Sequence, residues 1–232
     1  QVAPFNPAQA GFLLYASHAF FPGGTIFVAV VDPGVGGERK IVALEKFGQI
    51  FLAPDNGLLS LILSARGRAR AYDVTRPKGL SVASATFHGR DVFAPVAARL
   101  SRGEPVREIG PEISPEGLVC LPWAEPTYTQ ARRVKEVSGS VLHVDRFGNC
   151  LLNLLIDPWL ARIEAWPRIS LRLPEVRPVV LAKTYVGLPE KTLGLLAGSQ
   201  GVLELCLDRA SAAKALGLGI GHAVWLSSAP GD

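Results

Sequence analysis

Apolar positions in the first half of the chain switch between helical and strand-like spacing. Residues 8–21 carry apolar side chains three and four positions apart, which predicts a helix that ends at the following Pro-Gly-Gly. Residues 25–32 are β-branched and apolar throughout, as expected for a central strand covered on both faces. Two strands around a tight turn are predicted within 40–57, and a helix within 58–67. This alternation predicts a layered α/β domain with a central, mostly parallel sheet.

The pattern changes after residue 110. Residues 110–129 are rich in proline and have no sustained period, which is typical of a boundary between domains. Beyond them, short strands with alternating inward residues recur, with one short helix at 211–217. We therefore predict an α/β domain at 1–115, a linker at 116–129, and a smaller β-rich, barrel-like domain at 130–232.

Composition narrows the class of protein. Hydrophobic residues make up 48% of the chain, which excludes a disordered protein. No apolar run approaches the roughly 18 residues of a membrane span. The net charge is +4, but the basic residues are scattered, and we interpret the one cluster, at 65–70, as the solvated end of a helix. We therefore predict a protein that binds neither membrane nor nucleic acid.

The three cysteines, Cys120, Cys150 and Cys206, form neither an even disulfide set nor a group with metal-ligand spacing. They predict buried thiols in a reducing, cytoplasmic environment.

The sequence DPGVGG, which begins at Asp32, raises the possibility of a phosphate-binding loop. It has neither the lysine and hydroxyl of GxxxxGK[ST] nor the spacing of GxGxxG, and a strand rather than a helix follows it. A phosphate site is therefore disfavoured. Asp32 at the end of a strand fits a ligand site in an open α/β sheet, and it fits an aspartate that caps a tight turn equally well.

A second polar group lies in TFHGRDVFAP. His88 and Arg90 flank Gly89 just before a predicted helix, and Asp91 stands where a carboxylate suits the helix dipole. Imidazole suits proton handling near neutral pH, although a single loop histidine is more often structural. The third group, PDNGLLS, contains Asn56, and its Asp-Asn-Gly sequence is first of all typical of a tight turn.

A fourth group, VDRFGNCLLN, places Asp145, Asn149 and Asn153 near Phe147. A carboxylate, amides and an aromatic ring suit a ligand with an ammonium group, an amide edge and a flat ring. They suit a hairpin turn equally well.

Together, DPGVGGER, APDNGLLS, TFHGRDVFAP, VDRFGNCLLN and the later GSQGVLEL resemble the S-adenosyl-L-methionine (SAM) hydroxide adenosyltransferases. These SAM hydrolases are relatives of the SAM-dependent fluorinase and chlorinase. The resemblance implies attack of water or hydroxide on the ribose C5′ of SAM, which gives adenosine and L-methionine without a further cofactor. It also implies a homotrimer whose active sites lie between the amino-terminal domain of one subunit and the carboxyl-terminal domain of the next.

The resemblance also implies roles for individual residues. The catalytic constellation of the family falls on Asp32, Arg39 and His88. The positions expected to bind substrate are Asn56, Gly89, Asp145, Phe147, Asn149, Tyr185 and Ser199. Asp145 and Asn149 match positions that hold the methionine portion or adenine, Tyr185 matches an aromatic that stacks on adenine, and Ser199 matches a contact to the methionine end. His88 has no second histidine or cysteine at ligand spacing, so no metal is predicted.

Two alternatives to hydrolysis are open. A halogenase is disfavoured because the chain reads FHGRD where the fluorinase resembles FYSRE, and because Asp32 replaces a tyrosine. A carboxylate about 4 Å from a halide would cost roughly 4 kcal/mol at an effective dielectric of about 20. The other alternative is a non-catalytic relative that binds SAM or adenosine.

Departures from the family pattern support the alternative of a non-catalytic relative. Family members begin with a strand and a TDFG-type segment that contacts the ribose, and this sequence begins after that segment, so we expect the sheet to lack its first strand. Leu152 stands where the family tends to show threonine, and residues 208–213 stand where NxGNA is usual. We expect Ser211 to take over one hydrogen bond there.

Overall fold

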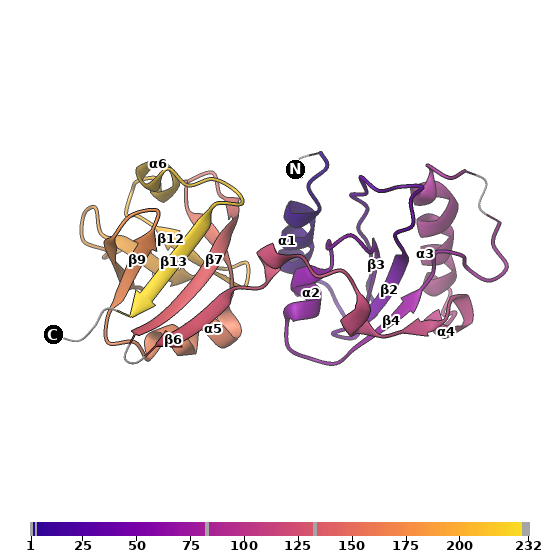
Figure 1. Ribbon diagram of the computed structural model, residues 1–232. Coiled ribbons are helices and arrows are strands. Elements are labelled where there is room, and N and C mark those ends of the chain that lie inside the picture. Colours follow the sequence, from indigo (N-terminus) through magenta and orange to yellow (C-terminus); the bar gives the residue numbers. More distant parts are fainter. Residues whose placement is uncertain (1, 3, 82–83, 132–133, 229–232) are drawn as a thin grey trace. The chain divides into compact units, whose positions relative to one another are not determined.

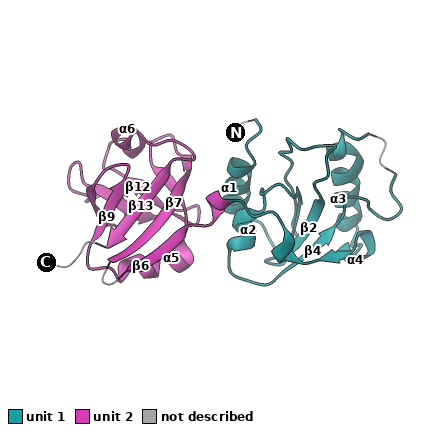
Figure 2. Cartoon of the chain, in the orientation of Figure 1, with its two compact units in different colours: residues 1–121 teal, residues 122–232 magenta. Residues whose placement is uncertain are grey.

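The computed structural model describes residues 2, 4–81, 84–131 and 134–228. The chain divides into two compact units, residues 1–121 and 122–232 (Figure 2). This division lies within the segment 116–129 that the sequence suggests as a linker.

The first unit contains a five-stranded sheet in the order β1-β3-β2-β4-β5. Its strands are β1 (Ile26–Val28), β2 (Ile41–Lys46), β3 (Gln49–Pro54), β4 (Ala69–Asp73) and β5 (Glu112–Ile113). Its helices are α1 (Pro7–His18), α2 (Ser60–Ser64), the π-helical turn η1 (Gly89–Phe93), α3 (Ala94–Ser101), α4 (Val106–Ile109) and the 3₁₀ turn η2 (Pro115–Gly117).

The α/β class is confirmed, but the expectation of a mostly parallel sheet is wrong for the described strands. Only β1 and β3 pair in parallel, and the other three pairings are antiparallel. The two-residue turn between β2 and β3 explains part of this. Phe47 and Gly48 have φ of 57° and 70°, the positive pair of a type I′ hairpin, and such a hairpin joins antiparallel strands.

Helices cover both faces of this sheet (Figure 1). Alternate residues of β2 face opposite sides: Val42 and Leu44 pack with α1 and α2, whereas Ile41 and Ala43 pack with η1, α3 and α4. The unit therefore has three layers. Gly11 allows the close approach of α1 to the start of α2, since a Cβ there would lie 2.3 Å from a backbone oxygen of Leu58.

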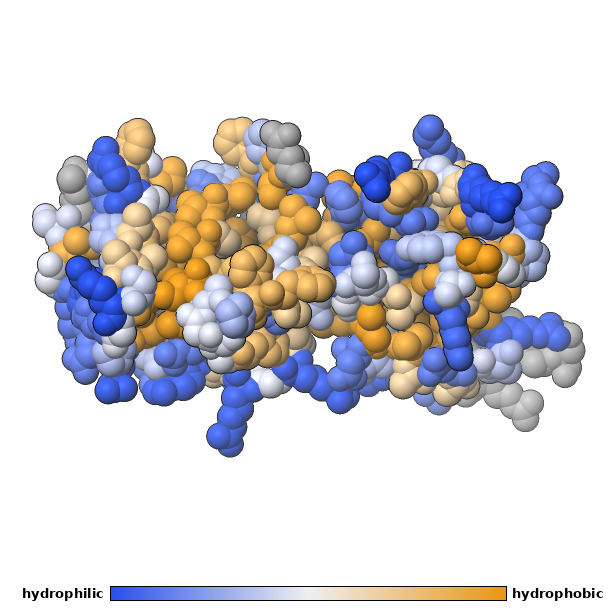
Figure 3. Space-filling model, turned by 180° about the vertical axis from the view of Figure 1, so that it is seen from behind, coloured by the Kyte–Doolittle hydropathy of each residue, from blue (hydrophilic) through white to orange (hydrophobic). Residues whose placement is uncertain are grey.

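The prediction that residues 25–32 form a central strand is also wrong. β1 lies at one edge of the sheet and pairs with β3 alone among the described strands. Val28 and Val30 are exposed, as are Phe20 and Phe21 just before the strand. On the face drawn in Figure 3, hydrophobic surface gathers over this unit.

The second unit is a closed β-barrel, as predicted. Its sheet runs β13-β9-β10-β11-β12-β8-β7-β6, and an antiparallel pairing between β13 and β7 closes the seven strands other than β6. The strands are β6 (Thr127–Ala131), β7 (Val134–Val144), β8 (Cys150–Leu155), β9 (Ile169–Leu173), β10 (Arg177–Leu181), β11 (Leu193–Ala197), β12 (Val202–Cys206) and β13 (Ala223–Ser228). The helical segments are η3 (Pro122–Ala124), α5 (Ile156–Glu164) and α6 (Ala212–Leu216).

Two smaller expectations need correction. The basic run at 65–70 does not end a helix: α2 ends at Ser64, and the run leads into β4, where Arg70 forms an ion pair with Glu112. Cys150 and Cys206 are buried as predicted, and burial raises their pKa to about 11 and about 12, but Cys120 is exposed. Among the described residues, no helix combines the length and apolarity needed to cross a bilayer.

Candidate active site

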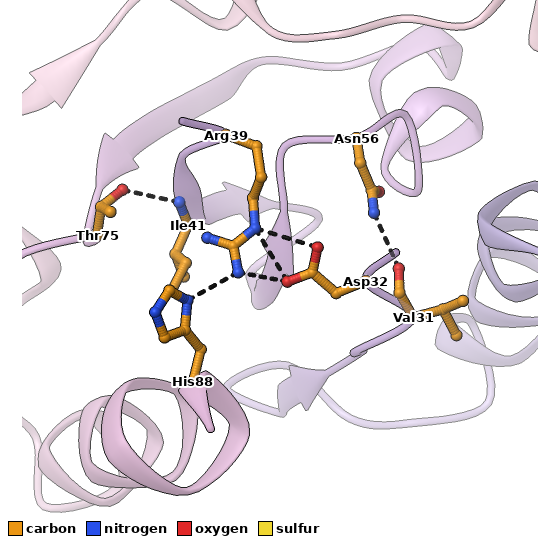
Figure 4. A network of polar contacts seen from close by, with 7 residues as sticks. All are labelled: Val31, Asp32, Arg39, Ile41, Asn56, Thr75 and His88. Atoms are coloured by element: carbon orange, nitrogen blue, oxygen red, sulfur yellow. Dashed lines mark hydrogen bonds and ion pairs between the residues drawn. The ribbon is translucent and has the colours of Figure 1, made fainter. Parts of the chain in front are cut away.

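Asp32, Arg39 and His88 meet in the first unit and form what we call the Asp-Arg-His cluster (Figure 4). The Nε of Arg39 donates to both carboxylate oxygens of Asp32, at 3.1 and 2.9 Å, and its Nη2 forms an ion pair with the same carboxylate. Nη2 also lies 2.8 Å from Nδ1 of His88. The side chains of Arg39 and Asp32 are 9% and 5% exposed, so this ion pair is largely shielded from water.

Backbone contacts position Asp32 within this cluster. The Nδ2 of Asn56, in the turn after β3, donates to the carbonyl oxygen of Val31 at 2.9 Å, and its Oδ1 accepts from the amide of Leu58 at 3.2 Å. Asn56, expected to bind substrate, thus ties the segment carrying Asp32 to the neighbouring turn. The backbone carbonyl oxygen of Asp32 also accepts from the amide of Val35, in the same loop, at 3.3 Å.

Gly36 in DPGVGG has a packing role. Gly36 has φ of 81°, and a Cβ there would lie 3.0 Å from the carbonyl oxygen of Ala85. Glycine therefore lets this turn approach the segment that precedes His88. The phosphate-loop alternative gains no support, because the turn runs into β2 rather than into a helix amino terminus.

His88 stands directly before η1, and its segment is tied down by Asp91. The Oδ2 of Asp91 accepts from the amide of Ser84 at 2.8 Å, and Arg90, which pairs with this carboxyl, holds the pKa of Asp91 below its usual range. A Cβ on Gly89 would meet no atom within 4 Å. Packing therefore does not require glycine at position 89.

The hydrogen-bond pattern fixes the roles of the nitrogen atoms in the cluster. A guanidinium can only donate, so Nδ1 of His88 accepts, and a neutral His88 carries its hydrogen on Nε2. The Nη1 of Arg39 is buried and has no hydrogen-bond partner in the part of the chain that the structure describes. Its two N–H groups are therefore available to an oxygen atom that enters the cluster. His88 also lines a hollow of about 460 Å³ with Thr75 and Arg76.

The second unit contains a pocket of about 750 Å³, which we call the barrel pocket. It brings together all five residues of this half that were expected to bind substrate. Its lining comprises Asp145, Phe147, Asn149, Tyr185, Val186, Ser199, Gln200, Glu204, Leu207, Asp208, Arg209, Ala210 and Ser211. The rings of Phe147 and Tyr185 are 65% and 44% exposed, so they offer apolar surface to a ligand.

Asp145 organises the turn between β7 and β8 at the edge of this pocket. Its Oδ1 accepts from the amides of Phe147 and Asn149, at 2.8 and 2.9 Å, and its Oδ2 accepts from Nδ2 of Asn149 at 2.9 Å. The hairpin-turn reading of VDRFGNC is therefore correct, and it is compatible with a ligand site because the same residues line the pocket. Ser211 also lines the pocket, and its Oγ caps α6 by accepting from the amide of Lys214 at 3.1 Å.

Asn153 is not part of the pocket lining. It is 1% exposed, its Oδ1 accepts from the amide of Ser140, and its Nδ2 donates to the carbonyl oxygen of Trp123, each at 2.7 Å. Asn153 therefore holds β7 and the start of the unit together.

Sequence reasoning missed Glu204. Glu204 is 2% exposed, lies in the apolar strand β12, and receives a hydrogen bond from the hydroxyl of Tyr185. The sequence did contain a signal for Glu204, because it is a glutamate inside the apolar run GVLELCL. Charged residues are rarely buried without a partner, so a glutamate in a buried strand indicates a specific contact. Among the described residues, no three histidine, cysteine or acidic side chains gather as metal ligands would.

Family models match both units of the chain. The SAM hydroxide adenosyltransferase N-terminal domain matches residues 1–110, and the C-terminal domain of the same name matches residues 139–225. The chain belongs to the SAM hydroxide adenosyltransferase family. The resemblance seen in the five sequence motifs is thereby confirmed.

Sequence comparison with individual proteins supports this family assignment. The chain is 37% identical to the (R)-S-adenosyl-L-methionine hydrolase of Thermus thermophilus, over 96% of this chain and 84% of that protein. It is 38% identical to the enzyme of the same name from Salinispora arenicola, over 93% and 79%. A fluorinase from an Actinoplanes species is more distant, at 27% identity over 58% of this chain and 53% of that protein.

Solved structures share the fold. A Thermotoga maritima structure, described as an uncharacterized conserved protein, matches with a TM-score of 0.79 and 30% identity, over 97% of this chain and 85% of that one. A conserved hypothetical protein from Thermus thermophilus matches with a TM-score of 0.68 and 33% identity, over 97% and 83%. The fold shared with these structures therefore extends over nearly the whole chain.

Proposed function

We propose that this protein is a SAM hydrolase that converts SAM and water to adenosine and L-methionine. Family membership and the names of its relatives support the reaction class. The geometric observation that carries the proposal is the Asp-Arg-His cluster itself, in which the guanidinium of Arg39 holds the carboxylate of Asp32 and the imidazole of His88 together. Such a group of donors and acceptors suits one small oxygen nucleophile.

The main requirement of this reaction is that the protein places the attacking water correctly. The oxygen of water attacks C5′ of the ribose, the C5′–S bond breaks, and its electron pair moves to sulfur. A positively charged sulfonium thereby becomes the neutral thioether of methionine, so the leaving group needs no proton. Holding the water in line with the C5′–S bond can contribute roughly 7–11 kcal/mol of the rate enhancement.

The attacking water loses its proton, and we propose that Asp32 receives it. Both nitrogens of His88 are in use, since Nδ1 accepts from Arg39 and Nε2 carries hydrogen. Each carboxylate oxygen of Asp32 has two lone-pair sites, so the bonds from Arg39 leave acceptor capacity for a water. The role of Arg39 is then to orient this carboxylate.

The barrel pocket fits the other parts of SAM. Its carboxylates at Asp145 and Asp208 suit the ammonium and sulfonium charges, and its exposed rings suit adenine. We propose that Asp145, Phe147, Asn149, Tyr185 and Ser199 contact the substrate. We also propose that the protein self-associates as a homotrimer in which these groups complete the Asp-Arg-His cluster of a neighbouring subunit, which sedimentation of the native protein tests.

The direct test is product analysis. Purified protein is incubated with each sulfonium epimer of SAM, because the relatives are named for the R epimer. Adenosine and methionine should form in equal amounts, with no change when chloride is added. SAM that binds tightly without turnover would instead identify a non-catalytic relative, and a 5′-halogenated nucleoside would identify a halogenase.

A further inference from the structure

The carboxyl group of Glu204 and the hydroxyl group of Tyr185 form a hydrogen-bonded pair in the wall of the barrel pocket. Glu204 comes from β12, where it pairs with Leu196 of β11 and lies opposite Leu151 of β8. The hydroxyl of Tyr185 donates to Oε1 of Glu204. Tyr185 itself comes from the segment between β10 and β11, so the bond joins this segment to the barrel.

The segment that carries Tyr185, residues 182–192, has other attachments to the barrel, and these are made by other residues. Leu188 is buried against Leu196 and Cys206, and Nη2 of Arg177 donates to the carbonyl oxygen of Lys191 at 2.6 Å. The ring of Tyr185 is 44% exposed. Its hydroxyl bond to Glu204 is therefore the polar contact that sets the direction of the ring over the pocket.

Glu204 is buried at a cost in free energy, and its carboxyl fits there only because the neighbouring residue at position 198 is glycine. A Cβ on Gly198 would lie 2.9 Å from Oε2 of Glu204, so a larger residue in the GSQG turn would displace the side chain. Burial raises the pKa of Glu204, and the nearby charge of Asp145 raises it further, whereas the hydrogen bond from Tyr185 lowers it. An apolar residue in this strand would avoid that cost, which suggests that the carboxyl has a role beyond stability.

We propose that Glu204 is a positioning residue, which holds the ring of Tyr185 as a wall of the barrel pocket against which the flat base of the substrate packs. The identity of the base as adenine rests on the function proposed above. The tether itself does not, because it is a contact within this chain. Glu204 acts here as a hydrogen-bond acceptor and not as a charge that touches the substrate.

Steady-state kinetics with the full-length chain test the role in binding. Tyr185→Phe and Glu204→Leu should each raise KM for SAM about fivefold, as expected for one lost hydrogen bond, with a smaller effect on kcat. The double variant should be no worse than either single variant. Glu204→Gln, which keeps an oxygen acceptor, should restore most of the affinity. The matched control is Tyr128→Phe, since the hydroxyl of Tyr128 bonds to Gln130 outside the pocket.

Two kinetic outcomes would overturn the proposal. If Glu204→Gln were as damaging as Glu204→Leu while Tyr185→Phe behaved like wild type, the carboxylate would contact the substrate directly. If the two single changes added fully in the double variant, the residues would act separately.

Limited trypsin digestion tests the tether without any substrate. Lys183 and Lys191 flank Tyr185 within the segment, so cleavage after them reports how often the segment leaves the barrel. Tyr185→Phe and Glu204→Leu should speed this cleavage about fivefold, and Tyr128→Phe should not. Unchanged cleavage in both variants would overturn the inference even if SAM is hydrolysed. Faster cleavage in a protein that does not turn over SAM would sink the proposed function and leave the tether standing.

Discussion

The Nη2 atom of Arg39 lies 2.8 Å from Nδ1 of His88 while the same guanidinium holds the carboxylate of Asp32. The arginine thereby fixes the tautomer of the histidine and the direction of the carboxylate together (Figure 4). A change to either neighbour should therefore affect chemistry more than binding.

The first prediction concerns turnover. Asp32→Ala and His88→Ala should each lower kcat by roughly 10²–10⁴-fold, the range for loss of a group that handles a proton or orients water, with a far smaller change in the Kd for SAM. Single-turnover rates and calorimetric titration measure the two quantities separately. His88→Asn is the matched variant, because its amide oxygen can accept from Arg39 in place of Nδ1, and it should retain more activity than His88→Ala. Unchanged turnover in both alanine variants would refute the proposed roles.

The second prediction concerns stability. Asp32→Asn leaves the charge of Arg39 buried without its counter-ion and should cost about 3–5 kcal/mol in the free energy of unfolding. The double variant Asp32→Asn/Arg39→Met removes that charge and should recover part of the loss. Urea unfolding of both variants measures this. A loss below about 0.5 kcal/mol for Asp32→Asn would mean that water reaches the pair freely.

A third prediction concerns Lys46, which is 3% exposed and caps the end of α2. Its Nζ donates to the carbonyl oxygens of Leu63 and Ala65, at 3.0 and 2.6 Å. Lys46→Met should lower the free energy of unfolding by about 1–3 kcal/mol, since it leaves these carbonyl groups without their donor. Turnover of SAM by the folded protein should not change. Lys214→Met, at an exposed position of α6, is the control, and equal losses in the two variants would contradict the capping role.

The fourth prediction uses the raised pKa of Glu204, whose main cause is burial. A carboxyl whose pKa is higher in the folded than in the unfolded state stabilises the fold below its unfolded pKa, near 4.5, and loses that contribution as pH rises through the folded pKa. Glu204→Gln does not titrate. The variant should therefore be more stable than wild type at pH 8, by an amount that shrinks as pH falls toward 4.5. A stability difference that is constant from pH 5 to pH 8 would show that burial does not perturb Glu204.

Local sequence signals predicted the elements that depend on local physics. The hairpin at Phe47–Gly48, the helix after His88 and the short helix α6 all follow from turn chemistry and apolar period. The sheet order did not follow, because pairing depends on contacts far apart in sequence. β1 illustrates this: its uniform apolar run fits a central strand, but the fold places it at an edge.

The sequence predicted most residues of the candidate site, but it did not predict the hydrogen bonds that hold them in place. Four of the five motifs supplied the Asp-Arg-His cluster and four members of the barrel pocket, and the fifth member, Tyr185, was assigned separately. No motif indicated that Asn56 would tie the backbone next to Asp32, or that Tyr185 would bond to Glu204. Those contacts join segments that are separate in sequence, so they require the folded structure.

The most direct test of the central claim is hydrolysis of SAM in water enriched in oxygen-18. If a water held by the Asp-Arg-His cluster attacks C5′, the adenosine formed should carry the label in its 5′-hydroxyl group, and the methionine should carry none. Mass spectrometry of the two products reads both positions in one experiment. Adenosine without the label, or no adenosine from SAM of either sulfonium configuration, would contradict the account.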